Sequence, residues 1–125
     1  MICISSILGG MDERLRPIER LQRSYEFRKV FDRGTCFRTP CLRVHFQRSD
    51  RELSRLGLVV SRRVGKATRR VRVKRMLRDI FRRHKDRLPQ VMDVVLIPRG
   101  PPRPHHEYLV AYLRFLEKIG SNGVP

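Results

Sequence analysis

The segment "KATRRVRVKRMLRDIFRRHKDR", Lys66 to Arg87, decides the fold because it joins an apolar helical face to a dense run of cations. At about 100° per residue, one arc of such a helix collects five apolar side chains, those of Val73, Met76, Leu77, Ile80 and Phe81. The other arc carries arginine and lysine, with Asp79 as its one acid, which we expect to pair with Arg75. The pattern predicts a helix that buries its apolar arc and leaves its cationic arc outside.

The segments before this helix predict one further helix and two strands. "SYEFRKVFDRG" (24–34) places apolar residues at helical spacing, with Ser24 as the expected N-cap and Gly34 as the stop. "CLRVHFQ" (41–47) alternates apolar and polar residues, which is typical of a half-buried strand. "LGLVVS" (56–61) is almost continuously apolar and indicates a more deeply buried strand. The two strands could form a hairpin.

The segments after the cationic helix predict a strand, a loop and a last helix. Pro89 marks the end of the cationic helix, and "VMDVVLI" (91–97) predicts another buried strand. "PRGPPRP" (98–104) predicts an exposed loop, because proline has no N–H to donate within a helix or a sheet. "HHEYLVAYLRFLEKIG" (105–120) predicts a helix that stops at Gly120. The apolar face of that helix is formed by Leu109, Tyr112, Leu113, Leu116 and Ile119.

These elements follow the order α-β-β-α-β-α, with room for one extra short strand. They predict an α+β fold, an α/β sandwich in which helices pack on a small central β-sheet. A chain of 125 residues is long enough for one modest core, so we assign a single domain to residues 16–120. Residues 1–15 are expected to form a disordered N-terminal extension, and residues 121–125 a tail.

The composition is strongly basic, with 29 Lys and Arg against 12 Asp and Glu and a formal net charge of +17. Repulsion on that scale destabilises a compact state unless a polyanion shares its surface. The three cysteines, Cys3, Cys36 and Cys41, form no C-x-x-C pair, which argues against a disulfide framework and a zinc site. A reducing, cytoplasmic setting fits this usage. No apolar run approaches the length needed to span a membrane.

The basic excess is concentrated, because residues 62–87 hold thirteen cations and two acids, or eleven of the seventeen net charges. A face kept cationic for solubility normally mixes signs, and a helix on a bilayer needs its apolar face for lipid. Phosphates of a nucleic acid would relieve the repulsion, and arginine binds them bidentately. No helix-turn-helix, zinc finger or basic zipper is present, so we favour RNA over DNA or a membrane as the partner.

The candidate RNA-binding residues are the cations in the helix and just before it: Arg62, Arg63, Lys66, Arg69, Arg70, Arg72, Lys74, Arg75, Arg78 and Arg82. The acids are scattered, and Asp93, inside a predicted strand, has no partner visible in the sequence. The adjacent His105 and His106 lack a third ligand at useful spacing. We therefore expect neither a catalytic residue nor a metal site in the protein itself.

The residues "SRRVGKATRRVRVKRMLRDIFRRHK" (61–85) resemble the signature of the bacterial ribonuclease P protein subunit. "RLQRSYEFRKVFDRGTCF" (20–37) and "DVVLIPRGPP" (93–102) resemble that family's first helix and its last strand and loop. The resemblance implies a left-handed crossover, shared with some ribosomal proteins, where general rules favour a right-handed one. It also implies a protein that binds the catalytic RNA subunit and the 5′ leader of precursor tRNA. Hydrolysis would be carried out by Mg²⁺ that is bound mainly by the RNA subunit.

The resemblance also assigns particular residues. The family's Arg-Asn-Arg core falls on Arg70, Val71 and Arg72, so Val71 stands where the family has an amide. The positions that match the family's leader-binding cleft, which the sheet and the first helix form, are Phe27, Phe31 and His45. His45 takes a place where the family often has tyrosine, and histidine can also stack on a base. A structural rRNA-binding protein of similar fold is the alternative, because charge supports both functions equally.

Overall fold

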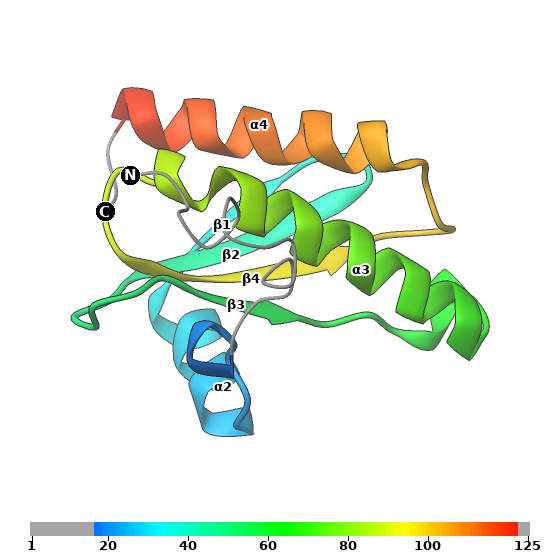
Figure 1. Cartoon of the computed structure of the whole chain (residues 1–125), viewed down its shortest axis with the longest axis horizontal. Helices are drawn as coiled ribbons and strands as arrows, with labels where there is room; N and C mark the ends of the chain where they lie inside the picture. The colour runs from blue at the N-terminus through cyan, green and yellow to red at the C-terminus, as the bar shows by residue number, and fades with distance from the viewer. Residues whose placement is uncertain (1–16, 123–125) are drawn as a thin grey trace, which may run out of the picture.

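The computed structural model describes residues 17–122, in which a four-stranded sheet lies between helices on its two faces (Figure 1). The helices are α2 (Ser24–Arg33), α3 (Ala67–His84) and α4 (His105–Asn122). The strands are β1 (Thr35–Arg38), β2 (Leu42–Arg48), β3 (Arg55–Leu58) and β4 (Met92–Pro98). The α+β class is confirmed, and β1 is the extra short strand.

The strand order is β1-β2-β4-β3, with β2 antiparallel to both β1 and β4 and with β3 parallel to β4. The predicted hairpin of β2 and β3 is wrong, because the chain returns after α3 and inserts β4 between them. Parallel pairing requires a crossover, which α3 supplies. The family resemblance implies a left-handed path for this β3–α3–β4 connection.

The main core lies on the sheet face that α3 and α4 cover (Figure 1). The predicted alternation of β2 is confirmed, because Leu42, Val44 and Phe46 are buried while the residues between them are only partly buried. The predicted apolar arc of α3 is confirmed too. Of its five members, Met76 is partly buried and four are fully buried: Val73, Leu77, Ile80 and Phe81.

Helix α4 turns a slightly different face to the sheet than the spacing predicted. Leu109 and Leu113 are only partly buried, whereas Tyr108 and Phe115 are fully buried. The Phe115 ring centroid lies 5.0 Å from that of Phe46, so contact with β2 sets the rotation of the helix.

The opposite sheet face carries a smaller cluster beneath α2. Leu21, Val30 and Val95 are buried there, with Phe27 and Ile97 packed against them. Gly57 of β3 permits this close approach, because a Cβ atom at that position would lie 2.5 Å from Cε1 of Phe27. The sheet is therefore fully covered on one face and crossed by a single short helix on the other.

Several predicted element ends are corrected by the structure. The N-cap of α2 is Arg23 rather than Ser24, and its backbone N–H donates to the Glu26 side chain. The third strand ends at Leu58, and the chain then turns into the short helix η3 (Arg62–Val64). Helix α4 continues through Gly120 to Asn122. Pro98 is not part of the exposed loop but ends β4, where it pairs with Leu42 and is buried.

Asp79 of α3 does not pair with Arg75 as predicted. Its carboxylate accepts hydrogen bonds from Arg82 at 3.0 Å and from Arg83 at 2.8 Å. Helical side chains lean toward the N-terminus, so long arginine side chains reach back to an acid one turn earlier.

The packing of Phe27 on Gly57 makes a testable prediction. We expect Gly57→Ala to lower the free energy of unfolding by about 1–3 kcal/mol, because the new methyl group would overlap the ring and Leu21. Gly120→Ala is the matched control: nothing lies within 4 Å of its added Cβ, and alanine favours a helix by up to about 1 kcal/mol. Equal unfolding midpoints for the two variants in a denaturant titration would contradict this packing.

Candidate nucleic-acid interface

A groove opens where α2 lies across the end of β3. It has a volume of about 560 Å³, and it is lined by Gln22, Ser24, Phe27, Arg28, Phe31, Asp32, Leu58 and Val59. Its walls combine two aromatic rings and two aliphatic side chains with polar groups at the rim. Such a surface suits an unpaired base better than a double helix, because a single-stranded base has a free face to stack.

Two of the three predicted cleft residues, Phe27 and Phe31, line this groove, and the third, His45, contacts Phe31 beside it. Phe31 is 40% exposed, and its ring meets the ring of His45 edge to face, with the centroids 4.9 Å apart. Phe27 lies one turn earlier, where it packs on the sheet and also lines the groove. Phe27 therefore belongs both to the small cluster beneath α2 and to the groove wall.

The sheet beside His45 carries two arginines that the sequence analysis missed. Arg43 lies two residues before His45 on β2, and it is directly opposite Arg38 of β1. Like charges placed opposite each other destabilise a strand pair, and an anion between them would relieve the repulsion. The Arg43 Nε atom is buried and has no hydrogen-bond partner within the described residues. Strict alternation along β2 places Arg43 on the same face as His45, so the sequence pattern alone could have identified it.

These surroundings also set the charge of His45. Burial lowers the pKa of His45 below its ordinary 6.5, and the charges of Arg43 and Arg38 lower it further. The imidazole is thus mainly neutral at pH 7, and a neutral ring stacks on a base without adding charge.

The second surface is the cationic arc of α3 with the turn before it. Gly65 has φ 142°, a conformation that a residue with a side chain rarely adopts, and this turn leads from η3 into α3. Six of the ten predicted RNA-binding residues are exposed: Arg62, Arg63, Lys66, Arg69, Arg72 and Arg75. Within residues 17–122 none of these six side chains has an acid partner.

The other four predicted cations are partly buried: Arg70, Lys74, Arg78 and Arg82. Two of them bind within the protein, because Arg70 Nε donates to the Gly65 carbonyl oxygen and Arg82 pairs with Asp79. Burial, and then the charges of Arg20 and Arg75, lower the pKa of Arg78. Arg20, which the sequence pattern did not single out, therefore extends the cationic surface.

A family model described as "Ribonuclease P" matches residues 15–119. The chain belongs to the bacterial ribonuclease P protein family. A ribonuclease P protein component from Thermotoga maritima is 42% identical over 89 residues, which cover 71% of this chain and 76% of the relative. A relative from Desulfosudis oleivorans is 38% identical over 81 residues, or 65% of this chain and 67% of the relative.

Solved structures of the family share the fold. The T. maritima ribonuclease P protein superposes with a TM-score of 0.72 at 35% identity, covering 81% of this chain and 97% of that one. The Staphylococcus aureus ribonuclease P protein gives a TM-score of 0.71 at 24% identity, covering 82% and 94%. The expected family and fold are therefore confirmed.

Val71, which departs from the family signature, is 46% exposed on α3. It lies between Arg70 and Arg72, on the side of the helix away from the core. The residue is therefore part of the cationic surface and not a displaced core residue.

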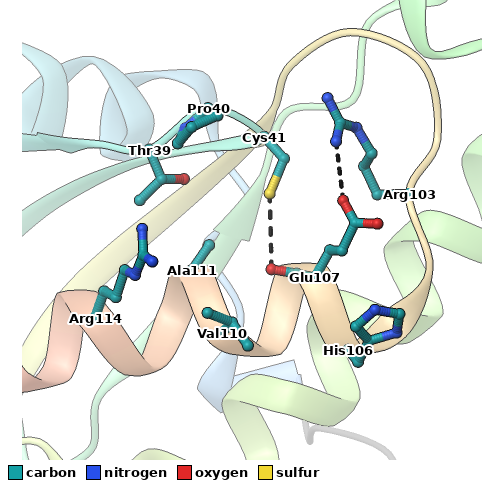
Figure 2. A pocket seen from close by; sticks show the side chains of 9 residues that line it. All are labelled: Thr39, Pro40, Cys41, Arg103, His106, Glu107, Val110, Ala111 and Arg114. Carbon is teal, nitrogen blue, oxygen red and sulfur yellow. Dashed lines mark hydrogen bonds and ion pairs between the residues drawn. The ribbon is translucent and has the colours of Figure 1, made fainter.

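A second hollow, of about 230 Å³, lies between the β1–β2 turn and α4 (Figure 2). Arg103 projects into it but is held by Glu107 at 2.9 Å. Cys41 donates through Sγ to the Glu107 carbonyl oxygen, and burial raises the pKa of this thiol. His106 also lines the hollow, yet no group of three or more metal-ligating side chains occurs among the described residues.

No described helix is long and apolar enough to cross a membrane.

The placement of His45 makes a prediction for NMR. We expect the His45 ring to titrate below pH 6.5 in the native protein, and Arg43→Gln to raise its pKa, because one neighbouring positive charge is removed. The chemical shifts of the ring protons, followed against pH, report this value. Arg114→Gln, an exposed change on α4, should leave the titration unchanged. A native pKa at or above 6.5 would contradict the assigned surroundings.

Proposed function

We propose that this protein is the RNA-binding, non-catalytic subunit of ribonuclease P. It binds the catalytic RNA subunit, holds the 5′ leader of precursor tRNA, and so assists the endonucleolytic cut that produces the mature tRNA 5′ end. Membership of the family supports the assignment to this ribonucleoprotein. The observation that carries the division of labour is the presence of two different surfaces, one cationic on α3 and one aromatic beside α2.

The cationic arc of α3 is suited to the RNA subunit. Exposed arginines without acid partners can hold phosphate oxygens bidentately, and the counterions that they release favour binding. Arg62, Arg63 and Lys66 extend the same surface into the turn before the helix. The Val71 side chain offers no hydrogen bond here, so either the neighbouring arginines suffice or the contact with RNA is weaker at this position.

The groove beside α2 is suited to the single-stranded leader. Phe31 and His45 offer ring surfaces, while Arg38 and Arg43 offer positive charge to the backbone. Stacking accepts any base, and this suits a leader whose sequence differs between tRNA precursors.

Two carboxylates beside α2 are already engaged within the protein. Glu26 and Asp93 are both bound by Arg55. Protein-bound metal hydrolysis needs carboxylates that are free to take a cation. We assign the hydrolysis to Mg²⁺ held mainly by the RNA subunit, as the family resemblance implies.

Cleavage of a precursor tRNA tests the proposal. A bacterial ribonuclease P RNA is given a 5′-extended precursor at low Mg²⁺, and the rate of leader removal is measured with and without the protein. We expect the protein to raise the rate, because its cations and groove replace contacts that high Mg²⁺ otherwise supports. Glu107→Gln, at the hollow on α4, is the control that should act like the native protein. No enhancement by the native protein would favour the alternative, a structural rRNA-binding protein.

The arginine face predicts a specific salt dependence. The affinity for the RNA subunit should fall linearly on a log–log plot against salt concentration, and Arg72→Ala or Arg75→Ala should each reduce the slope by about one. Arg103→Ala is the matched control, because that guanidinium is held by Glu107 beside α4. An unchanged slope in both α3 variants would remove these residues from the interface.

A further inference from the structure

Arg55, the first residue of β3, is the centre of a buried ion network. It is 8% exposed, and its Nε and Nη2 atoms donate to the two carboxylate oxygens of Asp93 at 3.0 and 2.9 Å. Its remaining Nη1 atom donates to Oε2 of Glu26 at 2.6 Å. Asp93 is the register partner of Arg55 on β4, whereas Glu26 belongs to α2. One guanidinium therefore joins two strands to the helix above them.

Glu26 carries this connection into the helix backbone. Its Oε1 atom accepts hydrogen bonds from the backbone N–H groups of Gln22 at 2.9 Å and Arg23 at 3.0 Å. Burial would raise the pKa of Glu26, but these bonds and the charge of Arg55 outweigh it and lower the pKa to about 2. The carboxylate stays ionised at neutral pH, so the first turn of α2 is tied to the sheet by charged hydrogen bonds.

Apart from Glu26, the side chains of α2 meet the sheet through apolar contacts, and near the helix start the Leu21 N–H donates to the Leu56 carbonyl oxygen of β3 at 2.9 Å. Val30 and Phe27 meet the sheet through apolar contacts with Val95, Ile97 and the bare surface of Gly57. Apolar contact is non-directional, so a short helix held by it alone can shift or rotate. The network instead fixes atoms of α2 at hydrogen-bond distance from β3 and β4.

This anchor lies directly beside the groove residues. Phe27 follows Glu26 in the chain, and Phe31 comes one turn later, where its ring meets His45. A shift of the first turn would move both rings relative to the sheet. The distance of 4.9 Å between the Phe31 and His45 ring centroids thus depends on where the network holds the helix.

We propose that Arg55 is a positioning residue for the leader groove: by tying Glu26 to Asp93, it holds Phe27 and Phe31 in register with His45. The inference rests on the proposed function of the groove in binding the leader. Arg55 makes no contact with RNA in this role, and it acts only through α2. The network lies on the α2 side of the sheet, while the α3 and α4 core lies on the other. Its loss should therefore separate leader binding from binding of the RNA subunit.

The test compares a variant that keeps the buried charges balanced with the native protein. Removing Arg55 alone would leave two buried carboxylates unpaired, so the variant is Arg55→Met with Glu26→Gln and Asp93→Asn. Each protein is assembled with a bacterial ribonuclease P RNA, and two affinities are measured: one for precursor tRNA with its leader and one for tRNA without it. We expect the affinity gained from the leader to fall roughly tenfold, the size of losing one stacked base. The affinity of the protein for the RNA subunit should stay the same.

A matched control separates positioning from stability. Leu116→Ala removes part of a buried side chain on α4, so it should lower the unfolding midpoint without touching α2. Under conditions in which both variants are folded, only the Arg55 variant should lose the leader-dependent gain. An unchanged gain in that variant, or an equal loss in the Leu116 variant, would overturn the positioning role.

A second readout is independent of RNA. The Phe31 and His45 rings meet at 88°, so displacement of α2 should change the chemical shifts of the His45 ring protons in the Arg55 variant but not in the Leu116 variant. Unchanged His45 shifts in the folded Arg55 variant would overturn the inference. If instead the native protein gives no leader-dependent gain while these shifts do change, the groove function fails and the positioning of Phe31 by Arg55 stands.

Discussion

Strand β4 must bury both of its faces, and the other elements take the positions that make this possible. It lies between β2 and β3, so both of its edges are paired. Val94 and Leu96 face the core under α3 and α4, and Val95 faces the cluster under α2. Asp93 is the one charged residue in this strand, and Arg55 of the neighbouring strand neutralises it. Each helix is thus placed by the side of β4 that it covers.

Five of the ten acids among residues 17–122 are held in ion pairs within the protein. Ion pairs inside the protein occupy Glu26 and Asp93 at Arg55, Asp79 at Arg82 and Arg83, Glu19 at Lys85, and Glu107 at Arg103. These acids are therefore not free to neutralise the exposed arginines of α3. A net charge of +17 in the whole chain becomes, at this face, a nearly unmixed positive surface. The use of acids for internal contacts is part of what makes the face suited to RNA.

The periodicity of the sequence predicted which faces of single helices and strands are buried. It did not predict which strands pair, because pairing depends on the path of the chain. The buried arc of α3 and the alternation of β2 follow from 3.6- and 2-residue periods, and both were predicted correctly. The partner of β2 was not, because β3 and β4 are both apolar and only the crossover decides which one lies beside it. Asp93 had no visible partner for the same reason: Arg55 lies 38 residues away in the chain. That Phe31 and His45 belong to one cleft was expected only from the family resemblance, and their ring contact was not predicted. Arg43 was overlooked although alternation places it on the face of His45.

The apolar and cationic arcs of α3 lie on different sides of the helix, so folding uses one arc and the proposed RNA binding uses the other. The apolar arc is buried in the core of the protein alone, so the cationic arc is already presented on the surface. In the free protein these cations repel one another fully. In a complex with RNA, the phosphates would neutralise them. Added salt is expected to screen the repulsion and so stabilise the free fold, while the same salt should weaken RNA binding because each released counterion gains less entropy at a higher bulk salt concentration. Salt therefore acts in opposite directions on stability and on RNA affinity, and both effects arise from the same exposed side chains.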